Sequence, residues 1–242
     1  MLLTKSTVSE IALAHPGAAR IFEQFHIDYC CGGRTSLAEA CVAAGVEVLQ
    51  IKKLLAQLGE TNDSLPVNWS EVSLTALIDH IESTHHVFTR QEIERLSPLL
   101  EKVCGVHSAA HPELLELENH FRALCNELGP HLRKEENVLF PYIRALTMVT
   151  DGQPPPLPPF GTVRNPVRMM SLEHDKAGQL LREMRAMSDN YQVPLDVCAS
   201  FQAVYLGLAG FEKDLHQHIH LENNVLFPRA IVLEDTLLRP PA

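Results

Sequence analysis

Residues 131–141 read HLRKEENVLFP and residues 218–228 read HIHLENNVLFP, so one pattern occurs twice, 87 residues apart. The last five letters, NVLFP, are identical in the two copies. Each copy contains a histidine that is followed four residues later by a glutamate, namely His131 with Glu135 and His218 with Glu222. Residues four apart are neighbours on one face of a helix, so both pairs are predicted to act as units.

One more histidine precedes each copy at nearly the same distance. His86 lies 45 residues before His131, and His174 lies 44 residues before His218. The repeat therefore predicts two related helical hairpins, each with one histidine on its first helix and the H-x-x-x-E pair on its second. Two such hairpins make a four-helix bundle with an internal two-fold repeat, and the fold class is all-α.

Apolar residues continue the helical spacing of both pairs. In the second copy, steps of four and three residues connect Val204, Leu208, Phe211, Leu215, His218, Glu222 and Val225. The first copy takes the same steps through Leu117, Phe121, Leu124, Leu128, His131, Glu135 and Val138. Apolar residues at this spacing form the stripe of a helix that faces a core. Both pairs are therefore expected to point into the bundle.

Two ionised glutamates in an apolar core are very costly without partners. A pair of metal ions, bridged by the carboxylates and completed by the imidazoles, removes this cost, and carboxylate-bridged bundles of this kind are known. Imidazole with carboxylate suits iron. Zinc is the rival metal, although structural zinc prefers a closed site of four ligands, often with cysteine.

Two features near the predicted ligands are less regular. The apolar stripe of the first helix, at Leu74, Ile78, Ile81 and Phe88, runs through His85 and leaves His86 beside it. Periodicity alone therefore selects His85. In the first copy of the repeat, Pro130 directly precedes His131 and predicts a kink in that helix.

The composition of the chain argues against some classes of binding partner. The 242 residues carry 30 acidic and 20 basic side chains, a net charge of -10, and no cluster of Lys and Arg. Nucleic acid is therefore not an expected partner. No apolar run approaches the ~20 residues that span a bilayer, so no membrane partner is expected. The first residues lack the pattern of a signal peptide, and we expect a cytoplasmic location. The six cysteines are expected to be reduced thiols.

Turn-forming and proline-rich stretches divide the chain into domains. A polar stretch around residues 59–66 separates a helical N-terminal domain, predicted at 1–62, from a bundle domain at 69–242. The sequence DGQPPPLPPFG, at 151–161, is the predicted linker between the two halves of the bundle. In the N-terminal domain, helices are expected over 8–14, 17–25 and 37–58, the last capped by Ser36 together with Glu39, with a loop Asp28-Tyr-Cys-Cys-Gly-Gly33 between the second and third.

The segments HLRKEENVLFP, LEHDKAG and HIHLENNVLFP resemble those of the hemerythrin-like bundle. With DYCCGG at residues 28–33, the chain resembles the repair-of-iron-centres family over roughly residues 5 to 232. The resemblance implies a small helical domain followed by a hemerythrin-like bundle. It also implies a di-iron protein that supports the recovery of iron–sulfur clusters from nitrosative and oxidative stress.

The resemblance implies six ligands for two iron ions, namely His86, His131, Glu135, His174, His218 and Glu222. Both glutamates would bridge the ions. The segment Leu77-Ile-Asp-His-Ile81 selects His86, six residues after its own histidine, and His85 is kept in reserve.

Other residues have less specific expected roles. Three acidic residues, Glu127, Glu173 and Asp214, could accept hydrogen bonds from ligand imidazoles or form an acidic route for iron or protons. The vicinal pair Cys30-Cys31 could serve redox chemistry or iron transfer, with plain packing as the alternative.

Damaged iron–sulfur proteins are the expected partners, with nitric oxide or dioxygen as small ligands, and a homodimer is left open. Iron supply is the expected function. Nitric oxide reduction at the centre, reversible oxygen binding, and iron or redox sensing are the alternatives.

Overall fold

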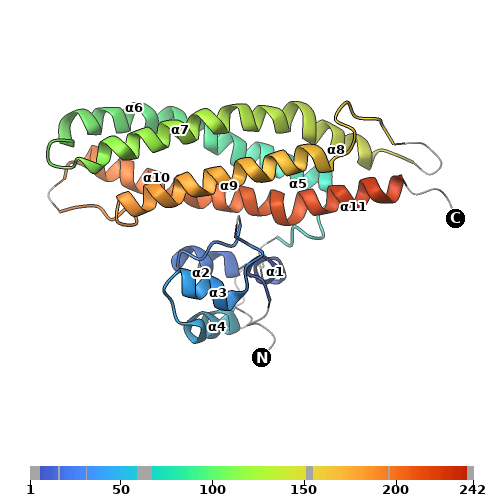
Figure 1. The fold of residues 1–242 in the computed structure, drawn as a ribbon, viewed down its shortest axis with the longest axis horizontal. Coiled ribbons are helices and arrows are strands. Elements are labelled where there is room, and N and C mark those ends of the chain that lie inside the picture. Colours follow the sequence, from blue (N-terminus) through green and yellow to red (C-terminus); the bar gives the residue numbers. More distant parts are fainter. Residues whose placement is uncertain are drawn as a thin grey trace.

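The computed structural model describes residues 6–15, 17–30, 32–58, 67–150, 155–195 and 197–238. Within these ranges the regular structure is helical, and one isolated β-bridge joins Thr7 to Ser36. The predicted all-α fold is therefore confirmed. Figure 1 shows a long bundle with a small helical domain against one of its sides.

The small domain contains four short helices, α1 (Val8–Ala14), α2 (Ala18–Gln24), α3 (Leu37–Ala43) and α4 (Val48–Gln57). Ser36 and Glu39 form the predicted capping box at the start of α3. The single helix expected over 37–58 is wrong. Gly45 adopts φ +69°, a left-handed conformation that ends a helix, and the chain restarts as α4.

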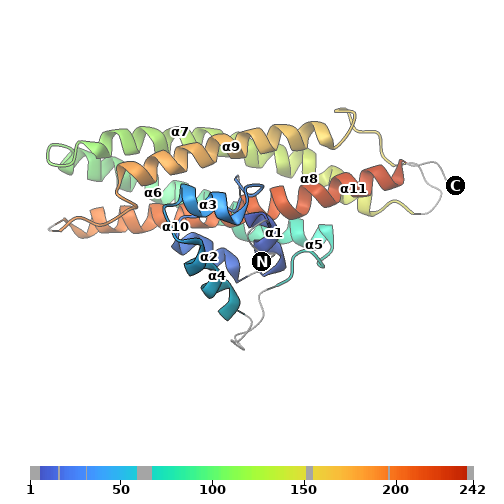
Figure 2. The same ribbon diagram turned by 60° about the horizontal axis from the view of Figure 1, so that its bottom comes forward.

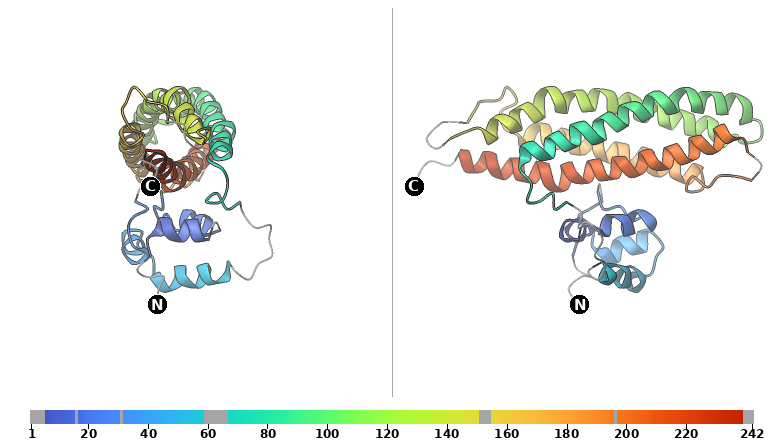
Figure 3. Two further views of the ribbon diagram at one scale, coloured as in Figure 1. Left: turned by 90° about the vertical axis from the view of Figure 1, so that its right-hand side faces the viewer. Right: turned by 180° about the vertical axis from the view of Figure 1, so that it is seen from behind.

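The bundle contains four rods, three of which include a π-helical segment. The first rod is α5 (Leu74–His80), η1 (Ile81–His86) and α6 (Val87–His107). The second is α7 (Glu113–Lys134), η2 (Glu135–Leu139) and α8 (Phe140–Thr147). The third is α9 (Arg164–Met187), and the fourth is α10 (Ala199–Leu221), η3 (Glu222–Leu226) and α11 (Phe227–Leu237). Figure 3, left, shows the four rods end-on around one axis. The two predicted helical hairpins are thus present.

The π segment η2 shifts the register of the apolar stripe in the second rod. The predicted stripe is buried from Leu117 to Glu135, but Val138 is 43% exposed and Leu139 is 1% exposed. A π turn adds one residue, so the buried face moves by one position after Glu135. In the fourth rod, Val225 is buried as predicted.

Pro130 does not interrupt the helix or the buried stripe, since Leu128 and His131 on either side of it are both buried. Helix α7 continues through this residue to Lys134. Pro130 lies on the exposed side of the helix, and Gly129 before it has no Cβ to collide with the proline ring.

Two apolar clusters fill the bundle on either side of the six predicted ligands. One cluster contains Leu128 and Leu215, and the other contains Leu139 and Leu226. The polar centre is thus enclosed between them. Among the described residues, no helix is both long and apolar enough to cross a membrane.

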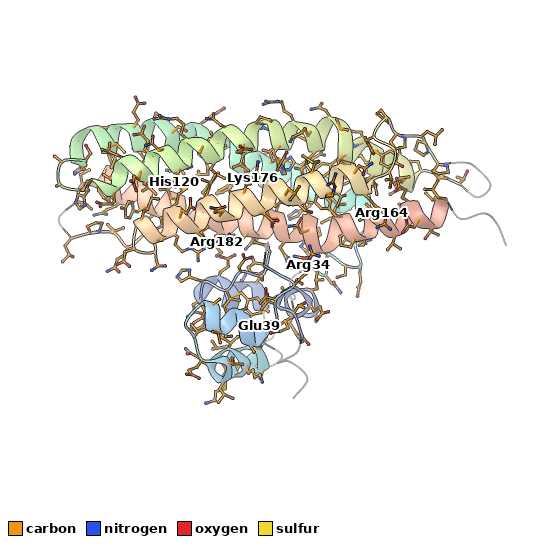
Figure 4. The ribbon with its side chains drawn as sticks, viewed as in Figure 1. Arg34, Glu39, His120, Arg164, Lys176 and Arg182 are labelled. Carbon is orange, nitrogen blue, oxygen red and sulfur yellow. The ribbon has the colours of Figure 1, made fainter. Side chains whose placement is uncertain are left out.

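The small domain docks on the bundle through the loop that follows α2. The Asn224 side chain donates to the Tyr29 carbonyl (3.4 Å), and the Tyr29 ring meets His220 edge-on at a centroid distance of 5.1 Å. Arg182, labelled in Figure 4 on the side of α9 that faces the small domain, pairs with Asp28 at 3.3 Å. In Figure 2, where the bottom of the molecule comes forward, the small domain lies in front of the fourth rod.

Candidate metal centre

Six buried side chains from all four rods converge at the middle of the bundle. They form two groups whose potential ligand atoms lie within 4.8 Å of one another. The first group is His86, Glu135, His218 and Glu222, and the second is His131, Glu135, His174 and Glu222. Both glutamates therefore belong to both groups. These are the six residues that the sequence and the resemblance single out as ligands.

The two glutamates fit a metal centre because their oxygens have no hydrogen-bond donor in the described chain. Glu135 and Glu222 are both 0% exposed, and all four carboxylate oxygens are buried without a hydrogen bond. Imidazole Nε2 atoms lie 3.1 to 3.5 Å from them, but not in hydrogen-bond geometry. Buried carboxylates in this state are stable only with counter-charges, which metal ions would supply.

In three of the four candidate ligand histidines, the Nδ1 atom makes a hydrogen bond to another side chain. His86 Nδ1 donates to Glu136 at 2.8 Å, and His131 Nδ1 donates to Glu173 at 2.8 Å. His174 Nδ1 donates to the side-chain oxygen of Asn223 at 3.0 Å. Bonds of this kind fix the ring and leave Nε2 pointing at the centre, as metal-binding imidazoles require.

Two of these acceptors were missed by sequence reasoning. Glu136 and Asn223 each follow a candidate bridging glutamate and occupy the same position in the two copies of the repeat. That shared position was the available signal. Arg90 binds Glu136 at 2.7 Å and Lys134 binds Glu173, so both carboxylate acceptors are themselves held by a cation.

Of the three acidic residues named from the sequence, only Glu173 contacts a candidate ligand imidazole. Asp214 instead binds His85 Nδ1 at 2.9 Å. Glu127 is exposed and makes no hydrogen bond to a ligand histidine, although it lines a small cavity beside His131.

The π segment η1 explains why the stripe of the first rod is ambiguous. It ends at His85 and His86, and both are buried. The extra residue in the turn brings His86 into the cluster, where its Nε2 lies 3.2 Å from His218 Nε2. His85 packs beside the cluster, its ring parallel to that of His218 at 5.7 Å.

Charges within the centre shift the pKa of its members. Burial alone would raise the pKa of Glu135 and Glu222, but the surrounding imidazoles hold both below the usual value. Burial would lower the pKa of His131, but the carboxylates Glu135, Glu222 and Glu173 together raise it to about 9. Metal ions would therefore displace protons on binding.

The predicted cysteine pair is only partly described. Cys30 is buried, and its Sγ and backbone N–H both face Asp28 Oδ1. Cys31 lies outside the described residues. Asn224, which binds the carbonyl of the preceding Tyr29, is two residues after Glu222, so the Cys30 loop adjoins the start of η3.

The match to known families covers both parts of the chain. Residues 76–230 match the Hemerythrin HHE cation binding domain, and residues 4–60 match a domain of unknown function, DUF542.

Similar proteins match over nearly their whole length. A "Probable iron-sulfur cluster repair protein" of Haemophilus influenzae is 34% identical over 235 residues, which cover 96% of this chain and 99% of the relative. Proteins named "Iron-sulfur cluster repair protein YtfE" from Salmonella schwarzengrund and Musicola paradisiaca are each 35% identical. The matched regions cover 94% of this chain in both cases, and 97% and 96% of the respective relatives. The chain therefore belongs to the iron–sulfur cluster repair family with a hemerythrin-type cation-binding bundle.

Proposed function

We propose that the chain is a di-iron protein that supports the repair of damaged iron–sulfur clusters by supplying iron. The observation that carries this proposal is the pair of buried groups that share Glu135 and Glu222. Because each carboxylate has two oxygens and belongs to both groups, it can contribute one oxygen to each of two ions. The names of the relatives support cluster repair as the process in which the ions are used.

The donor set supports iron over zinc. It consists of imidazole nitrogens and carboxylate oxygens with no thiolate, on four helices of one bundle. Six donors arranged as two overlapping sets differ from the closed set of four that structural zinc prefers. Nitrogen and oxygen donors of this type suit iron in bundles of this architecture.

The protein side chains have distinct tasks in this proposal. Glu135 and Glu222 would join the two positions, and four histidines would complete them. Iron bound there would supply a redox-active cation that can be given up to a cluster lacking one. Glu136 and Glu173 would orient His86 and His131 through their Nδ1–H groups.

The Cys30 loop is proposed to assist iron transfer. It lies next to η3, the segment that begins with Glu222. Thiolates bind iron in clusters, so the vicinal pair Cys30-Cys31 has suitable chemistry for passing iron on. The names of the relatives favour repair over the alternatives of nitric oxide reduction, oxygen carriage or sensing.

The test is the restoration of a damaged cluster enzyme by the iron-loaded protein. The loaded wild type should restore activity, and Glu135→Leu should not, because it removes a bridging carboxylate. Glu94→Leu is the matched control, since Glu94 is an exposed glutamate on α6, away from the centre. Equal restoration by the wild type, Glu135→Leu and an equivalent amount of free iron would contradict the proposal.

A further inference from the structure

The two candidate metal positions differ in how their histidines are supported. In the group of His131 and His174, both Nδ1 atoms have an acceptor, a carboxylate and an amide oxygen. In the group of His86 and His218, only His86 has one. His218 is 1% exposed, and its Nδ1 is buried without a hydrogen-bond partner in the described chain.

The internal repeat shows where the missing acceptor should be. His131 and His218 are equivalent, and so are His86 and His174. Glu173, which precedes His174, accepts from His131. The equivalent residue, which precedes His86, is His85. A histidine therefore stands where the other half of the bundle has a carboxylate.

His85 cannot take over the role of Glu173. Its Nδ1 is engaged by Asp214 Oδ1 at 2.9 Å, and its ring lies parallel to that of His218, with 5° between the planes. The ring centroids lie 5.7 Å apart, and His218 Nδ1 makes no hydrogen bond to His85. His85 thus packs against His218 without accepting a hydrogen bond from it.

A cavity of about 340 Å³ lies beside this pair, between the bundle and the small domain. His85 and Asp214 line it from the bundle, and Leu13 and Tyr29 line it from the small domain. The imidazole that packs beside His218 therefore borders this cavity. With no acceptor on Nδ1 in the described chain, His218 has one orienting hydrogen bond fewer than each of the other three candidate ligand histidines.

We infer that the position of His86 and His218 is the exchangeable position of the centre, from which an ion leaves first. Loss of the partner that orients a ligand histidine typically lowers metal affinity by about 10- to 100-fold. The inference rests on the proposed di-iron centre and assigns different affinities to its two positions. An ion should therefore leave first from the group whose histidine lacks an acceptor, and this group should be the second to fill when metal is limiting.

The test measures the release of Fe²⁺ from the full chain into a chromophoric ferrous chelator without oxygen. Elemental analysis of the loaded protein first gives the number of ions per chain. Release should then follow two phases of equal amplitude, with rates that differ by about 10- to 100-fold. Two ions released in one phase would overturn the inference and leave the di-iron centre intact. Fewer than two ions per chain would contradict the centre itself.

Two matched variants assign the phases to the positions. Glu136→Ala removes the acceptor of His86, and Glu173→Ala removes that of His131. Both side chains are partly exposed, at 24% and 17%, and each is held by one cation. Glu136→Ala should accelerate only the fast phase, and Glu173→Ala should accelerate only the slow phase. The opposite assignment would overturn the inference.

A third variant restores the missing acceptor. His85→Glu places a carboxylate where the repeat has Glu173, and Asp214→Asn in the same chain removes the repulsion from its neighbour. The fast phase should slow toward the slow one, while the slow phase stays unchanged. A fast phase that the double variant leaves unaltered would overturn the assignment, provided that thermal unfolding shows a folded bundle.

Discussion

A substitution at the side chain that accepts a hydrogen bond from His174 should change the metal affinity of the centre. Asn223 accepts from His174 Nδ1 at 3.0 Å, whereas Glu136, at the same position in the repeat, accepts from His86 at 2.8 Å. Asn223→Asp has nearly the same shape and converts a neutral acceptor into a charged one. A neutral hydrogen bond contributes about 0.5–1.5 kcal/mol and one to a charged group about 1.5–3 kcal/mol.

The difference between these ranges is about 1 kcal/mol, which corresponds to roughly a fivefold change in affinity. Asn223→Asp should therefore bind the ion of the His131 and His174 position about fivefold more tightly. Asn223→Ala, which removes the orienting acceptor altogether, should bind it about 10- to 100-fold more weakly. Competition between the protein and a chromophoric chelator for Fe²⁺ would measure both. Tighter binding by the alanine variant than by the aspartate variant would refute the role given to this acceptor.

Two further predictions concern packing and metal-linked stability. A Cβ on Gly207 would lie 2.6 Å from the buried Leu96 side chain, so Gly207→Ala should destabilise the bundle by about 1–3 kcal/mol relative to Gly210→Ala, which meets nothing within 4 Å. Urea unfolding would measure this, and equal stability of the two variants would refute the close approach of α6 and α10. Removing metal should lower the melting temperature, because each ion held at 100 times its Kd contributes about 2.7 kcal/mol. Glu222→Leu should show no such metal-dependent shift, and a shift equal to that of the wild type would contradict the role of Glu222.

Most of the fold could be predicted from the internal repeat. Two copies of a histidine and glutamate pair on an apolar stripe were sufficient to predict the hairpins and the inward direction of His131, Glu135, His218 and Glu222. The strict helical period predicted burial correctly in one π segment, where Val225 of η3 is buried, and incorrectly in another. The exception is η2, in which Val138 is exposed and Leu139 is buried in its place.

The choice between His85 and His86 could not be made from periodicity for the same reason. Both residues lie in η1, where an added residue turns two successive side chains toward the core. The resemblance to a family selected His86, and the structure brings that residue into the cluster.

Contacts between distant segments were beyond the sequence patterns. The bond from Asn224 to the Tyr29 carbonyl joins residues 195 positions apart, and no periodicity connects them. The acceptors Glu136 and Asn223 were accessible in principle, because they occupy one position of the repeat. Because one copy has a carboxylate at this position and the other has an amide, their common role as hydrogen-bond acceptors was not apparent from the sequence.

Elemental analysis of the protein, purified without added metal, tests the central claim most directly. The proposed di-iron centre predicts about two iron ions per chain, since two groups of donors share Glu135 and Glu222. It also predicts that Glu135→Leu and Glu222→Leu lose this iron while remaining folded. A wild-type chain without metal, or with one zinc ion that both variants retain, would contradict the di-iron centre.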